Sequence, residues 1–172
     1  MQDRTAKDAP ELVQARDQTE SGTFENISGE VYESAPPAIK NRLLSELVGK
    51  VYATAPPIEK TRLVAHLMKP LGILSLVTVA NGVFASIRFR SVSNDFPLGV
   101  DDVQRVQARD VIALASHAQQ VSMEAVNGLA HILATSPAMM SSAAALLLLQ
   151  ILMRQARKRR ANDVGTAADD LS

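Results

Sequence analysis

Two stretches of the chain contain no charged residue, and a basic cluster follows each of them. The first, Pro70 to Ile87, reads PLGILSLVTVANGVFASI, and Arg88 and Arg90 come directly after it. The second, Pro137 to Met153, reads PAMMSSAAALLLLQILM, and five Arg or Lys residues follow between positions 154 and 160. Uncharged runs of this length are buried either in protein or in lipid, so a helical bundle and a membrane protein are the two interpretations.

Residues 31–70 contain an internal duplication. VYESAPPAIKNRLLSELVGK is followed without a gap by VYATAPPIEKTRLVAHLMKP, and nine of the twenty positions are identical. Proline suits the first turn of a helix, and Ser34 and Thr54 are candidate N-terminal caps. Each copy therefore predicts a helix of roughly ten to twelve residues, the first ending at Gly49. Two copies are too few for a solenoid, so we interpret them as a packing hairpin; docking of a partner or of anionic lipid is the alternative.

The first apolar run is compatible with two structures. As a helix, it places four small residues on one stripe, as in close helix contacts within bilayers: Ser75, Thr78, Gly82 and Ala85. As two strands, it would turn at Asn81-Gly82, a dipeptide typical of tight hairpins. We favour the helix because the residues before Asn81 show no polar alternation and because both flanks predict helices.

Residues 101–135 predict one long amphipathic helix. Its apolar, alanine-rich face offers a seam for self-association or for a protein partner, and its main packing residues are Val111, Leu114, Ala118, Val121 and Ala125. The opposite face is polar and includes His117, Glu124 and His131. A second apolar helix over residues 137–153 follows, with residues 154–160 as its basic flank.

The length of the two apolar runs allows a membrane span. Seventeen or eighteen helical residues reach about 26 Å, whereas the hydrocarbon core of a bilayer is about 30 Å thick. The positive-inside rule would place both termini in the cytoplasm. The expected contacts with lipid and its anionic headgroups are Leu146, Leu147, Leu148, Leu149, Ile151, Leu152, Arg154, Arg157, Lys158, Arg159 and Arg160. A mean hydropathy of only +0.03 supports the other interpretation, a soluble cytoplasmic bundle.

Composition narrows the fold class further. Aromatic residues make up 3% of the chain and there is no tryptophan, so Leu, Val, Ile, Ala and Met must build a core of packed helices. The net charge of zero hides opposite blocks: residues 1–30 hold seven acids and three bases, whereas residues 154–172 hold five bases and three acids. The polar segments 1–28 and 161–172 predict disordered tails.

The sequence offers little for catalysis. It has no cysteine, which excludes disulfides and thiolate sites, and it lacks the glycine-rich motifs of nucleotide-binding loops and hydrolase elbows. His117, Glu124 and His131 are seven residues apart, about 10 Å along a helix, so they cannot bind one metal ion. The basic run has no interleaved aromatic residues for base stacking, which argues against a nucleic-acid partner.

We therefore predict an all-α, non-catalytic, membrane-associated scaffold or adaptor, with no cofactor and no metal ion. Its expected partners are anionic membrane lipid and either a second copy of the chain or another protein. The first alternative is a soluble helical oligomer that coats a hydrophobic body such as a storage inclusion. The second is a proton- or metal-using enzyme with His117 and His131 paired across a dimer.

Overall fold

The computed structural model describes residues 30–94 and 98–169, and every regular element within these residues is a helix. The predicted all-α fold is confirmed. After a helical turn over residues 30–34, the elements are α2 Pro37–Thr54, α3 Pro57–Met68, α4 Ile73–Thr78, the 3₁₀ turn η1 Ala80–Gly82, α5 Val83–Asn94, α6 Val100–Gln104, α7 Ala108–Val121, α8 Met123–Asn127, α9 Leu129–Thr135 and α10 Ala143–Asp169. The tail predicted over residues 1–28 lies outside the described residues.

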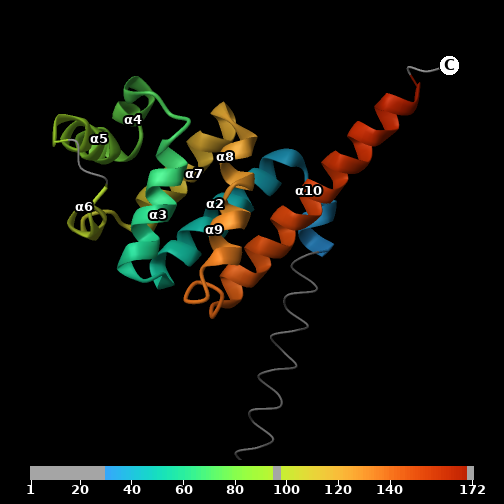
Figure 1. Cartoon of the computed structure of the whole chain (residues 1–172), viewed down its shortest axis with the longest axis horizontal. Helices are drawn as coiled ribbons and strands as arrows, with labels where there is room; N and C mark the ends of the chain where they lie inside the picture. Colours follow the sequence, from blue (N-terminus) through green and yellow to red (C-terminus); the bar gives the residue numbers. More distant parts are fainter. Residues whose placement is uncertain (1–29, 95–97, 170–172) are drawn as a thin grey trace, which may run out of the picture.

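Helices α2 and α7 pack side by side at the centre of the bundle, and α3 and α10 pack against this pair. Figure 1 shows α4, α5 and α6 together at one end of the molecule, while the C-terminal part of α10 projects from the other end. The core consists almost entirely of aliphatic side chains, joined by the buried aromatic rings of Tyr32, Tyr52 and Phe84. Because few aromatic rings fill the core, the helices pack closely against one another.

The contact between α2 and α7 depends on a glycine. A Cβ atom placed on Gly49 would lie 2.4 Å from Ile112 Cγ1 and 3.2 Å from the Ala108 carbonyl oxygen, so a larger residue would require the Ile112 side chain or α7 itself to shift. The prediction that Gly49 ends the first helix is wrong, since α2 continues to Thr54. The close packing on α7 outweighs the roughly 1 kcal/mol that glycine costs within a helix.

The duplication forms two equivalent junctions between helices rather than two equivalent helices. Each proline pair begins a helix, α2 after the first junction and α3 after the second. Ser34 and Thr54 do not cap these helices, as the sequence suggested; each hydroxyl instead donates back to carbonyl oxygens of the preceding turn. The first copy exceeds the predicted length because α2 runs on into the start of the second copy, and the twelve-residue α3 matches the prediction.

The apolar run 70–87 is helical but interrupted. Ala80, Asn81 and Gly82 have φ angles of 49°, 56° and 76°, and this left-handed turn separates α4 from α5. Asn and Gly adopt this conformation at little cost, so the dipeptide does mark a turn, but between helices and not between strands. The predicted stripe of Ser75, Thr78, Gly82 and Ala85 is therefore broken, with only Ala85 buried.

The single helix predicted over residues 101–135 is in fact four short helices, α6 to α9. Breaks occur after Gln104, at Ser122, whose φ and ψ are −154° and 112°, and at Gly128. Side chains favour the starts of α6 and α7, since the backbone N–H of Gly99 donates to Asp102 and that of Gln107 donates to Asp110, whereas α8 and α9 begin without a side-chain cap. The predicted packing residues Val111, Leu114, Ala118 and Ala125 are buried, whereas Val121 is 53% exposed.

Helix α10 differs from the predicted apolar helix at both ends. Residues 137–142 form turns, and the helix begins only at Ala143 and then continues through the basic residues to Asp169. Residues 161–169, expected to be a disordered tail, are therefore helical. The apolar part from Ala143 to Met153 spans only about 16 Å. Among the described residues, no helix is long and apolar enough to cross a membrane, so the predicted transmembrane spans are not supported.

Candidate functional site

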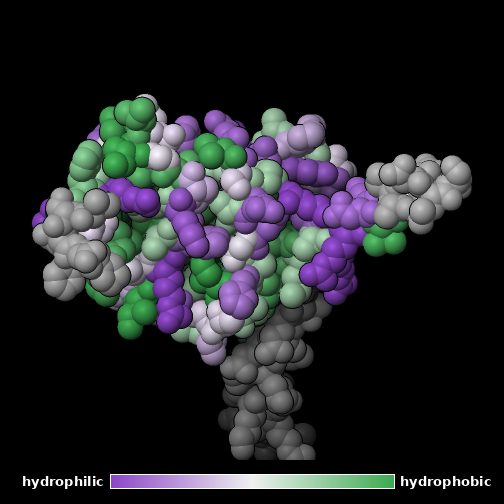
Figure 2. All heavy atoms as spheres, turned by 45° about the horizontal axis from the view of Figure 1, so that its top comes forward, coloured by the Kyte–Doolittle hydropathy of each residue, from purple (hydrophilic) through white to green (hydrophobic). Residues whose placement is uncertain are grey.

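The first candidate site is an apolar surface on α4, formed by Ile73, Leu74 and Val77. All three side chains are exposed, and Leu74 has 86% of its surface in contact with solvent. Their spacing places them on one side of the helix, while Leu76 is fully buried beneath them. Figure 2 shows hydrophobic atoms gathered at this end of the molecule. We call these three residues the α4 face.

The segment of the chain that carries the α4 face is basic. Residues 69–94 contain three bases and no acid. Lys69 is exposed just before α4, and Arg88 is half-buried on α5. Arg90 forms an ion pair with Asp102 at 3.0 Å, which joins α5 to α6. An apolar protrusion with basic neighbours is the combination that peripheral proteins use at anionic membrane surfaces.

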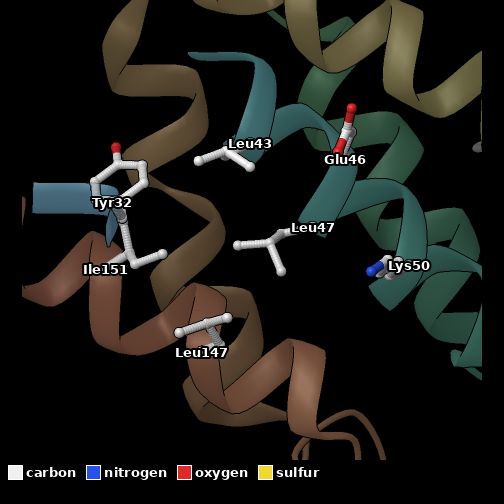
Figure 3. Close-up of a pocket in the computed structure, with 7 residues that line it drawn as sticks. All are labelled: Tyr32, Leu43, Glu46, Leu47, Lys50, Leu147 and Ile151. Atoms are coloured by element: carbon white, nitrogen blue, oxygen red, sulfur yellow. The ribbon is translucent and has the colours of Figure 1, made fainter. Parts of the chain in front are cut away.

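The second candidate site is a groove of about 190 Å³ between α2 and α10. Leu43 and Leu47 of α2 face Leu147 and Ile151 of α10, and Tyr32 lies at one end (Figure 3). Glu46 and Lys50 complete the lining on the α2 side. The groove is therefore apolar at its base and charged at its rim.

Polar contacts of the turn at residues 30–34 hold α10 beside this groove. Gln155 Nε2 donates to the Tyr32 hydroxyl oxygen at 2.5 Å, and Lys158 pairs with Glu33. Burial raises the pKa of Tyr32 to about 12, with a further contribution from the negative charge of Glu33. The hydrogen bond from Lys158 lowers the pKa of Glu33. Both contacts stabilise α10 at the level where its apolar part ends.

The residues expected to contact lipid fall into three groups. Leu148, Ile151 and Leu152 are buried against other parts of the protein. Leu147 and Leu149 are partly buried, and Leu146 is 42% exposed. The five bases Arg154, Arg157, Lys158, Arg159 and Arg160 are exposed on the projecting part of α10. In this conformation the α10 surface is more basic than apolar.

The three histidines do not converge. His117 lies on α7 and His131 on α9, and the breaks between these helices remove the shared face that the sequence suggested. His66 Nε2 lies 2.8 Å from the Ala125 carbonyl oxygen, where a protonated Nε2 donates a hydrogen bond. Within residues 30–94 and 98–169, no group of three or more His, Asp or Glu side chains could hold a metal ion.

Sequence reasoning missed both candidate sites. The sequence did not reveal the α4 face, because a continuous helix over the apolar run was expected to be buried in protein or to cross a bilayer. The dipeptide Asn81-Gly82 did signal an interruption. The groove was hidden because it joins segments more than a hundred residues apart in the chain. Comparison with protein-family models, with curated proteins and with solved structures finds no match for this chain.

Proposed function

We propose that the protein is a non-catalytic, membrane-associated helical adaptor that binds the surface of an anionic bilayer through the α4 face. The observation that carries this proposal is the 86% exposure of Leu74 beside exposed Ile73 and Val77. Because Leu148, Ile151 and Leu152 are occupied in the core, the apolar contact comes from the first uncharged run instead of the second. Self-association of the chain remains a separate prediction.

The expected strength is that of a reversible peripheral protein. Complete burial of a Leu, Ile or Val side chain contributes about 1.5–3 kcal/mol, and the partly covered α4 face would contribute about 4 kcal/mol in total. A base near an anionic surface adds about 1 kcal/mol. The sum is close to the membrane affinity of a single myristoyl chain, with an association constant of about 10⁴ M⁻¹. Binding should therefore depend on lipid charge and on salt.

Vesicle sedimentation tests this proposal with the full chain. Vesicles of phosphatidylcholine with phosphatidylserine should bind the protein, and vesicles of phosphatidylcholine alone should bind it more weakly. The double variant Leu74→Ser, Val77→Ser should lose about tenfold in affinity or more, because it removes most of the apolar contact. The matched control is Val121→Ser with Val164→Ser, which changes two exposed valines elsewhere. Equal binding by both double variants would refute the proposal.

The alternative of a coat on a hydrophobic body is less well supported. That function required the apolar part of α10 and the long amphipathic helix to form a broad adsorbing face. Instead, Leu148 and Leu152 are fully buried, and the long helix is divided into four short ones. The exposed apolar surface of α4 is small, which suits insertion among headgroups better than coverage of a large hydrophobic surface.

A further inference from the structure

We infer that the groove between α2 and α10, together with the projecting basic part of α10, is a docking site for an acidic segment of a partner protein. The partner segment would place one bulky apolar side chain in the groove and its carboxylates against α10. This inference goes beyond the proposed membrane contact, because it concerns a different surface. It supplies the second binding site that an adaptor needs.

The size of the groove indicates what enters it. Ligand pockets for small molecules usually measure about 300–1,000 Å³, and this groove of about 190 Å³ is smaller. A cavity of about 150 Å³ lined by apolar side chains is large enough for benzene. The groove therefore accommodates one ring or one branched aliphatic side chain. A single apolar anchor of this size is a common feature of peptide docking in grooves.

The charges around the groove indicate the sign of the charge on the partner segment. The two acids nearest to it are already paired, Glu46 with Arg42 at 3.0 Å and Glu33 with Lys158. No carboxylate whose position the structure describes forms an ion pair with the remaining bases along the rim and the α10 extension, which are Lys50, Arg154, Arg157, Arg159 and Arg160. An acidic segment would therefore find several bases that form no ion pair, with Asp163 one helical turn beyond Arg159 and Arg160 and with Glu33, whose pKa the charge of Arg154 helps to lower, as the acids beside them.

The shape favours a protein segment over a lipid surface. The groove is a recess between two helices, and Figure 3 shows its leucine side chains facing the opposite wall. A protruding side chain can enter such a recess, whereas a flat headgroup layer makes contact with protrusions such as the α4 face. The exposed bases then lie one to three helical turns beyond Ile151, within reach of a short peptide.

Fluorescence anisotropy tests the inference with the full chain. The probe is a fluorescein-labelled synthetic peptide in which a Phe-Leu pair is flanked on both sides by Glu-Ala repeats. We expect binding in the micromolar range, lost when the Phe-Leu pair is replaced by Ser-Ser. The variant Arg157→Glu, Arg160→Glu should weaken binding by about tenfold or more, because both side chains are exposed and attract the peptide. Leu47→Phe, which narrows the groove, should weaken binding without removing any charge.

The matched control is Lys69→Glu with Arg88→Glu, the same charge change near the α4 face. This variant should bind the peptide normally and bind anionic vesicles less. The α10 variant, Arg157→Glu with Arg160→Glu, should bind the peptide less and bind anionic vesicles normally. Circular dichroism and urea unfolding confirm that each variant is folded. Failure of the proposed membrane function would leave the peptide results unchanged, so the two proposals fail separately.

Several results would overturn the inference. The first is no peptide binding up to about 1 mM, and the second is equal binding of the Ser-Ser peptide. A third is loss of vesicle binding by the α10 variant with no change in peptide binding, which would assign the bases to lipid headgroups. Release of the probe by a synthetic peptide of residues 1–29 would assign the groove to the chain's own acidic segment.

Discussion

The two copies of the duplication have the same local structure but different roles in the fold. In each copy, the backbone N–H of the alanine before the proline pair donates to the carbonyl oxygens three and four residues earlier. In each copy, a lysine ammonium lies over the ring of the conserved tyrosine, at 5.8 Å for Lys40 over Tyr32 and at 5.1 Å for Lys60 over Tyr52. The shared letters therefore specify a junction between two helices.

The tertiary environment of the two junctions differs. The Tyr52 hydroxyl donates to the carbonyl oxygens of Val103 and Val106 at 2.8 and 3.0 Å, and thereby attaches the end of α6 and the segment that follows it to the core. The Tyr32 hydroxyl accepts a hydrogen bond from Gln155 and attaches α10 at the edge. The preceding valine is 1% exposed in the second copy and 54% exposed in the first. A duplicated motif thus fixes local geometry, while its neighbours decide how much stability it contributes.

Exchanging residues between the copies should have the largest effect at Gly49, whose counterpart in the second copy is Lys69. Gly49→Lys should lower the free energy of unfolding by more than about 3 kcal/mol, because it overpacks the contact with Ile112 and brings a charge into it. The reverse exchange, Lys69→Gly, should change stability by about 1 kcal/mol or less, because Lys69 is exposed at the end of α3. Urea unfolding measures both. Equal midpoints would contradict the close α2–α7 packing.

The next largest effect is expected at the buried tyrosine. Tyr52→Phe should cost about 1–3 kcal/mol, because the Val106 carbonyl oxygen would be left without its hydrogen-bond donor in the core. Urea unfolding again gives the free energy. The ring itself remains, so the packing of α2 and the position of Lys60 should be unaffected. A loss below about 0.5 kcal/mol would show that water replaces the hydroxyl and that the site is open.

These contrasts show what the sequence could and could not predict. The duplication, the proline starts and the 3.6-residue periodicity correctly predicted helices at α2 and α3. Asn81-Gly82 carried a correct turn signal, but local propensity alone could not decide between a hairpin of strands and a break between helices. Apolar periodicity continued across Ser122 and Gly128, so it did not reveal the breaks there. The groove depends on contacts distant in sequence, which no local pattern contains.

A smaller effect is expected at the first tyrosine. Tyr32→Phe should cost about 0.5–1.5 kcal/mol, because it removes one hydrogen bond at the edge of the fold. The chain has only two tyrosines, so each single variant reports on the remaining ring. Burial raises the pKa of each ring to about 12 from an ordinary value near 10.

The raised pKa values of the two tyrosines determine how stability changes with pH. The folded state favours the neutral ring, so this contribution to stability is complete below pH 10 and is lost as the pH rises through about 12. Ultraviolet absorbance of tyrosinate should therefore show late ionisation in both single variants, ending in alkaline unfolding. Ordinary ionisation near pH 10 in Tyr52→Phe, with Tyr32 as reporter, would mean that the junction near α10 is open in solution.

The smallest effect is expected at Glu33, which pairs with Lys158 and whose counterpart in the second copy is Ala53. Glu33→Ala makes the first copy resemble the second and should cost at most about 1 kcal/mol, because the pair is partly exposed to solvent.

The effect of Glu33→Ala on the free energy of unfolding should depend on pH. Since Lys158 lowers the pKa of Glu33, the pair stabilises the fold above the ordinary pKa of a glutamate, and this contribution disappears as the pH falls through the lowered value. Wild type and variant should therefore differ in unfolding free energy at neutral pH and converge in acid. A constant difference at all pH values would mean that Glu33 acts through packing and not through its charge.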